Sequence, residues 1–164
     1  MLTIRQQLSM FVPPQSATDL ERVRHIVDPI QSNLIPAHIT LCREDELTDF
    51  STIRDRLKNL QMPAITLNFG PAQVFYEHGL ILHCISGEEV FLQLREYVLG
   101  TNEIRKQYPH LTLAHPRNPK DTGNSLALAA SLSHPLKISF TDIHLIEQEG
   151  SAPWRVLQSF PLSQ

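Results

Sequence analysis

The sequence has few cysteines and no long apolar run. Its 164 residues include only two cysteines, Cys42 and Cys84, and each lies in an apolar stretch typical of a strand. This pattern favours buried free thiols in a reducing compartment. No apolar run approaches the roughly 18 residues that a membrane helix needs. Arg5, Gln6 and Gln7 interrupt the apolar residues near the amino terminus, unlike a signal peptide. We therefore expect a cytoplasmic protein that makes no membrane contact.

Positive charge and glycine-rich loops are also scarce. Lysine and arginine number 14 against 17 acidic residues, for a net charge of −3, which argues against a broadly basic nucleic-acid surface but leaves room for a local basic patch. No glycine-rich phosphate loop is present, which disfavours a dinucleotide-binding or nucleoside-triphosphatase fold. The apolar fraction of 41% is that of an ordinary globular protein. The length predicts a single domain over residues 1–164.

The alternation of strand-like and helix-like stretches predicts an α+β fold. The expected strands cover residues 7–13, 37–42, 64–76, 79–86, 110–115, 136–148 and 154–162, and the expected helices cover 18–34, 49–60, 86–100 and 124–133. Several connections are short, which favours an antiparallel or mixed sheet over a doubly wound parallel one.

Two of the expected helices begin with a capping-box pattern. Thr18 precedes Glu21 by three residues, and Ser86 precedes Glu89 by the same spacing. Each pair predicts a side-chain cap at the start of its helix. Gly100 is expected to end the second of these helices, because glycine readily adopts the left-handed conformation found there.

One four-residue pattern, His-aliphatic-Thr-Leu, occurs twice, at residues 38–41 and 110–113. With only eight histidines in the chain, chance would produce it well under once. On a strand, the histidine and threonine share one face while the two aliphatic residues share the other. Two such strands side by side would present two imidazoles and two hydroxyls on one polar surface.

This set of side chains suits phosphoryl chemistry. Imidazole titrates near neutral pH, so one histidine can accept a proton from a nucleophile while the other donates one to a leaving oxygen. Threonine hydroxyls can bind the non-bridging oxygens of a phosphodiester. The pattern predicts acid–base catalysis that needs neither a metal nor another cofactor.

Two other kinds of site are disfavoured. His78 and His83 are five residues apart, as are His110 and His115. In a strand that spacing places the two rings on opposite faces, and no Cys or Asp/Glu cluster completes a zinc ligand set. No local signature of an activated serine or cysteine nucleophile surrounds any Ser or Cys.

The paired tetrads resemble the two-histidine phosphoesterase superfamily, which includes 2′-5′ RNA ligase-like proteins and 2′,3′-cyclic nucleotide phosphodiesterases. The stretches "LSMFVPP", "FGPAQVFYEHGLILHCIS" and "IHLIEQEGSAPWRVLQSFPL" are similar to further segments of that family, so the resemblance covers nearly the whole chain. It implies a bilobal α+β fold with two antiparallel sheets related by pseudo-two-fold symmetry around a central cleft, and with helices on the outside.

The resemblance also implies roles for the tetrad residues. His38 and His110 would form the acid–base pair of a phosphodiesterase, while Thr40 and Thr112 would bind phosphate. A nucleotide or a short RNA end is the expected partner, with no obligate protein partner. The pattern leaves open cyclic-phosphate opening, 2′-5′ bond cleavage or ligation, RNA-end trimming, binding without turnover, and a purely structural role for the tetrads. It also leaves open which histidine is the acid.

Three further residues are candidates for substrate binding. Arg43 ends the first tetrad strand and Arg117 follows the second, so either could approach an anion. Tyr108 lies two residues before His110 and could stack on a base. Other aromatic side chains with the same potential are Phe11, Tyr76 and Trp154. An ordinary place in the surface or core is the alternative for each of them.

Overall fold

The computed structural model describes residues 1–118 and 122–163. Its strands are β1 Ile4–Phe11, β2 His38–Cys42, β3 Ile65–Phe75, β4 Gly79–Ser86, β5 His110–Ala114, β6 Leu136–Phe140, β7 Asp142–Glu149 and β8 Arg155–Pro161. Its helices are α1 Pro14–Val27, α2 Pro29–Leu34, α3 Phe50–Lys58, α4 Glu88–Leu99 and α5 Thr122–Ala129, with a 3₁₀ turn η1 at Glu44–Glu46. No helix within the described ranges is long and apolar enough to cross a membrane.

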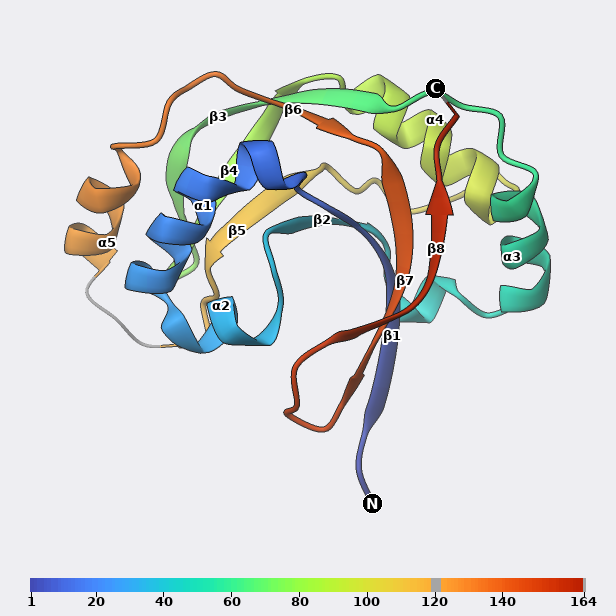
Figure 1. Cartoon of the computed structure of the whole chain (residues 1–164), viewed down its shortest axis with the longest axis horizontal. Coiled ribbons are helices and arrows are strands. Elements are labelled where there is room, and N and C mark those ends of the chain that lie inside the picture. Colours follow the sequence, from blue (N-terminus) through green and yellow to red (C-terminus); the bar gives the residue numbers. More distant parts are fainter. Residues whose placement is uncertain (119–121, 164) are drawn as a thin grey trace.

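The strands form two antiparallel sheets of four strands each. Their orders are β2-β1-β7-β8 and β5-β4-β3-β6, and all the pairings within them are antiparallel. In each sheet a tetrad strand, β2 or β5, occupies one edge and pairs with the strand that precedes it across a helix. Helices α1, α2 and α5 gather on one side of the molecule, and α3 and α4 on the other (Figure 1). The predicted α+β fold with two antiparallel sheets is confirmed.

The two tetrad strands have the same alternating burial. Ile39 and Leu41 on β2 are fully buried, and Leu111 and Leu113 on β5 are about 1% exposed, while the histidines and threonines between them are only partly buried. Burial of each large aliphatic side chain stabilises the fold by about 1.5–3 kcal/mol. The aliphatic faces therefore anchor both strands in the core and turn the polar faces outward from it.

The expected cap at Thr18 is wrong. Helix α1 begins at Pro14, with Pro13 as its N-cap residue, because proline tolerates the first helical turn, where its missing N–H has no partner to lose. Glu21 binds elsewhere, accepting a hydrogen bond from the Ala37 N–H. The helical stretch also breaks in two, since Asp28 caps a second helix that starts at Pro29.

Two further boundaries differ from the sequence-based expectation. The N-cap of α4 is Gly87 at φ 98°, without a side-chain cap from Ser86, and a Cβ there would lie 2.6 Å from the Thr66 carbonyl oxygen. Only glycine fits this close approach. Gly100 ends α4 at φ 73°, as predicted. The expected strand over residues 136–148 is instead two strands, β6 and β7, which belong to different sheets.

Candidate active site

A polar cavity of about 210 Å³ lies where β2 and β5 face each other. All four side chains of the predicted site, His38, Thr40, His110 and Thr112, line it. The other lining residues come from β1, α1, α2 and the segments after β5 and β7: Arg5, Gln7, Arg24, Gln31, Ile35, His115, Arg117 and Trp154. The two tetrads, 72 residues apart in the sequence, thus form one site at the junction of the two sheets.

The two tetrad histidines are held in the same way. His38 Nδ1 lies 2.8 Å from the Pro36 carbonyl oxygen, and His110 Nδ1 lies 3.2 Å from the Tyr108 carbonyl oxygen. A carbonyl can only accept, so each neutral ring carries its proton on Nδ1 and leaves Nε2 unprotonated. An unprotonated Nε2 can accept a proton, which is the property that a general base needs.

The surroundings of both histidines oppose protonation. Burial lowers the pKa of His38 to about 4, and the charges of Arg24 and His110 act in the same direction. The Pro36 carbonyl opposes this shift. Burial also lowers the pKa of His110, with a further lowering from the nearby His83 and Arg43 charges. Both imidazoles are therefore neutral at neutral pH in the unliganded protein.

Thr40 has a polar neighbour on β1. Gln7 donates from its amide nitrogen to Ser9 Oγ at 2.8 Å and makes a longer contact of 3.5 Å with Thr40 Oγ1. Since Gln7 approaches as a donor, the Thr40 hydroxyl hydrogen is left to point elsewhere. This arrangement suits a hydroxyl that donates to a substrate oxygen.

Arginines give the cavity a positive character. Arg5, Arg24 and Arg117 all line it, and Arg117 is oriented by donating to Gln31 Oε1 at 3.1 Å. Arg43 lines an adjoining cavity of about 390 Å³ that shares Thr40, His110 and Trp154 with the first. The predicted residues Arg43 and Arg117 therefore both lie at the cleft.

Tyr108 is placed differently from the expectation. Its side chain is 64% exposed and lines a separate shallow hollow beside Glu88, Glu89 and Leu92 of α4. Only its backbone carbonyl contacts the site, through His110. The aromatic ring that lines both cleft cavities is that of Trp154, with the Arg5 guanidinium 5.2 Å from its centroid.

The sequence reading missed Arg24 as a residue of the site. The helical spacing could have indicated it. Arg24 lies four residues after Leu20 and three before Val27, on the apolar face of its helix. A charged residue in such a position must be paired inside the protein. Arg5 and Gln7 carry no comparable signal in the sequence.

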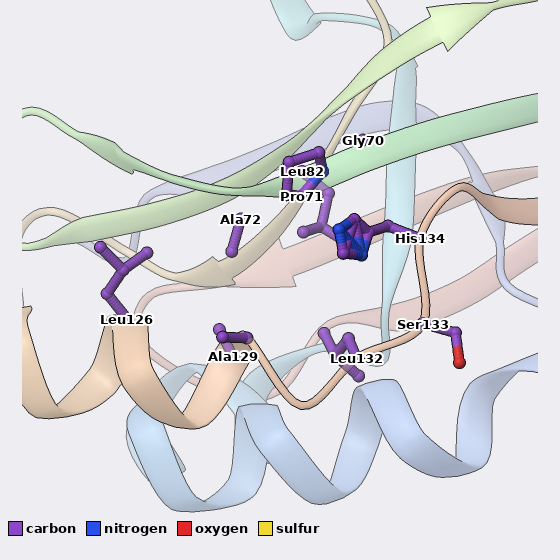
Figure 2. Close-up of a pocket in the computed structure, with 10 residues that line it drawn as sticks. Gly70, Pro71, Ala72, Leu82, Leu126, Ala129, Leu132, Ser133 and His134 are labelled. Atoms are coloured by element: carbon purple, nitrogen blue, oxygen red, sulfur yellow. The ribbon is translucent and has the colours of Figure 1, made fainter.

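A second cavity lies away from the histidines. Figure 2 shows it between α5 and the β3–β4 pair, with the side chains of Ala72, Leu126 and Leu132 around it. Its volume is about 240 Å³ and it is lined mainly by apolar residues. No tetrad residue contributes to it, so it is separate from the cavity that holds the tetrads.

A metal centre finds no support among the described residues. No group of three histidine, cysteine, aspartate or glutamate side chains gathers there in a way that could hold an ion. Cys42 is buried and Cys84 half-buried, both as free thiols. The cavity that holds the tetrads is lined by imidazole, hydroxyl and guanidinium groups, among others.

Comparison with known proteins agrees with this geometry. The family model of the 2′-5′ RNA ligase superfamily matches residues 12–152. The fold is similar to that of E. coli LigT in its apo form, with a TM-score of 0.62 at 13% identity over 100% of both chains. It is also similar to LigT complexed with NADP⁺ (0.59, 14%, 98% of both chains) and to a crystal structure of a phosphoesterase (0.57, 13%, 98% of both chains). No curated protein sequence matches the chain.

Proposed function

The chain belongs to the 2′-5′ RNA ligase superfamily, and from this premise we propose that it is a metal-independent phosphodiesterase. Its substrates are 2′,3′-cyclic phosphates or 2′-5′-linked nucleotides and RNA ends. The observation that carries the proposal is the convergence of both His-x-Thr pairs on one polar cavity. Nucleotide recognition is in keeping with the complexes of E. coli LigT with 3′-AMP and ATP.

In the proposed reaction, Thr40 and Thr112 donate hydrogen bonds to the non-bridging oxygens of the phosphodiester. His38 Nε2 accepts a proton from water, whose oxygen forms a new bond to phosphorus. The bond between phosphorus and one ribose oxygen breaks, and His110 donates a proton to that leaving oxygen. Burial lowers the pKa of His38 to about 4, so this ring is unprotonated at neutral pH, which a general base requires.

His110 must be protonated to act as the acid. Its pKa is lowered in the unliganded protein, but a bound phosphodiester carries a negative charge that favours the imidazolium beside it. Substrate binding would therefore charge His110 and prepare it to donate. The same electrostatic effect would strengthen the hold on the substrate.

The Arg5–Trp154 pair is the proposed base-binding surface. The guanidinium lies 5.2 Å from the indole centroid, and both residues line both cavities. Indole and guanidinium planes both stack on nucleobases. This assignment replaces Tyr108, whose ring lies outside the cleft.

The test is hydrolysis of 2′,3′-cyclic mononucleotides and 2′-5′-linked dinucleotides in the presence of EDTA. We expect turnover by the wild type and a loss of about 10²–10⁴-fold in kcat for His38→Ala and for His110→Ala. Nucleotide binding by Thr40→Ala and Thr112→Ala, compared with product formation by the wild type, distinguishes an enzyme from a protein that only binds. If these variants weaken nucleotide binding while the wild type forms no product, the protein is a binding module instead.

A further inference from the structure

Two buried arginines occupy the apolar faces of α1 and α4. The exposed fraction of Arg24 is 1% and that of Arg95 is 0%. Removing a guanidinium from water is costly unless it is paired and hydrogen-bonded. Apolar residues could fill the same positions. The hydrogen-bond partners of the two arginines therefore indicate what a guanidinium contributes there.

Arg24 links the second tetrad strand to the segment that leads into the first. Its Nε donates to the Thr112 carbonyl oxygen at 3.2 Å, and one terminal nitrogen donates to the Ile35 carbonyl oxygen at 2.8 Å. Thr112 is in the second tetrad, whereas Ile35 lies three residues before His38. The remaining terminal nitrogen binds both carboxylate oxygens of Glu21 at 3.0 Å. Glu21 in turn accepts from the Ala37 N–H at 2.6 Å, directly before the first tetrad.

Arg95 links the first tetrad strand to the segment that leads into the second. It donates to the Leu41 carbonyl oxygen, in the first tetrad, and at 3.2 Å to the Arg105 carbonyl oxygen, five residues before His110. Glu46 supplies the paired carboxylate at 2.8 Å. Gln107 strengthens the link, since it contacts Arg95 and also donates to the Thr40 carbonyl oxygen at 2.6 Å.

The two sets of contacts follow one pattern. Each arginine binds a carbonyl of one tetrad strand and a carbonyl of the segment that leads into the other. Each is neutralised by one carboxylate that also binds backbone N–H groups near the first tetrad, Ala37 for Glu21 and Arg43 for Glu46. A rigid planar fork with five donors can hold several fixed acceptors at once, which a lysine ammonium cannot do in the same geometry.

We propose that Arg24 and Arg95 are positioning residues that set the separation of His38 and His110 across the cleft. The inference rests on the proposed function, because the separation matters only if both histidines act on one phosphate. Strands β2 and β5 belong to different sheets, so no ladder of backbone hydrogen bonds fixes their distance. Arg24, Arg95 and Gln107 provide side-chain links between them.

The test replaces each arginine with lysine, which keeps the charge but not the fork. For Arg24→Lys and Arg95→Lys we expect kcat to fall about 10–100-fold with KM changed less than about 3-fold, since a 1 Å misplacement of catalytic groups costs about 10²-fold. The matched control is Arg22→Lys on α1, where Arg22 is exposed and pairs with the exposed Asp19 at 3.6 Å. This control should keep the wild-type kcat. Circular dichroism melting identifies a temperature at which every variant is folded.

A second measurement does not depend on turnover. Imidazole ¹⁵N spectra during titration with inorganic phosphate report whether both histidines engage one anion. In the wild type, we expect the signals of His38 and His110 to shift together with a single Kd. In the lysine variants, we expect the two signals no longer to shift together, because the misplaced rings cannot both contact one anion. If the wild type binds phosphate at both rings but hydrolyses nothing, the proposed function is wrong. The phosphate titrations of the lysine variants then still test the positioning role.

Two results would overturn the positioning role. One is a lower melting temperature for both lysine variants with kcat unchanged where they are folded, which would mean that the arginines only stabilise the protein. The other is a wild-type phosphate response of both imidazole signals in both variants. A kcat loss in both lysine variants, absent from Arg22→Lys and accompanied by the changed phosphate response, supports it.

Discussion

In His38, the burial that keeps the proposed base unprotonated also carries a cost in stability. Its ring contacts Phe11 with centroids 6.3 Å apart, its Nδ1 faces the Pro36 carbonyl oxygen, and its pKa is lowered to about 4, chiefly by burial. A neutral imidazole with a free Nε2 is suited to accept a proton at neutral pH. The same burial makes protonation of the folded protein unfavourable.

Stability should therefore depend on pH through His38. In the unfolded chain this histidine has an ordinary pKa of about 6.5, so between pH 6.5 and 4 the unfolded state binds a proton that the folded state does not. Stability is lost as pH falls through this window, by about 2 kcal/mol at pH 4.5. Urea unfolding at pH 7 and pH 4.5 measures the difference. His38→Gln should show a smaller loss, while the exposed His25→Gln should behave as wild type. Equal losses in all three proteins would contradict this explanation.

At the scale of elements, Asp28 joins three segments near the cleft. It is 1% exposed, caps α2 by accepting from the Gln31 N–H, and accepts from the His115 N–H at 2.8 Å. It also accepts from the Asn118 side-chain amide at 3.0 Å. The carboxylate thus fixes the α1–α2 junction to the end of β5, next to the residues that line the cavity.

Removal of this carboxylate should be strongly destabilising. Asp28→Ala leaves buried backbone N–H groups without their acceptor, which we expect to lower the free energy of unfolding by about 3 kcal/mol. Chemical denaturation measures the change, with Asp19→Ala on the exposed face of α1 as the control. A loss below about 0.5 kcal/mol would show that water replaces the carboxylate at this junction.

The tetrad strands were predictable because a period of two fixes which residues share a face. The helix starts were not predictable, since Thr18 and Ser86 match a local capping pattern but neither residue caps a helix in the structure. Gly87 is required by its approach to the Thr66 carbonyl. Trp154 could not be preferred over Tyr108 from sequence, because only the arrangement of β7 and β8 brings it to the cleft.

For the whole molecule, charge is distributed unevenly. The net charge is −3, yet among the described residues that line the tetrad cavity three are arginines and none is acidic. Arg24 is paired with Glu21, and Arg5 and Arg117 carry the positive charge of the lining. A concave, positively charged surface attracts anions even when the molecule as a whole repels them. Overall composition therefore gave no indication of an anionic substrate, and the local arrangement does.

This distribution predicts a salt dependence of substrate binding. Raising ionic strength from about 50 to 500 mM should increase KM about 3–10-fold, with a smaller effect on kcat, because screening weakens attraction to the anion more than the proton transfers within the cavity. Steady-state kinetics at several potassium chloride concentrations measures both constants. A KM independent of salt would mean that the arginines do not attract the substrate.

The paired action of His38 and His110 is tested most directly by the hydrolysis rates of the wild type, both single alanine variants and the double variant on one 2′,3′-cyclic nucleotide. Residues that act as a unit are strongly non-additive. We predict a loss of about 10²–10⁴-fold in each single variant, and a double variant no slower than the slower single one. Multiplicative losses, or a single variant with wild-type activity, would contradict a concerted acid–base pair.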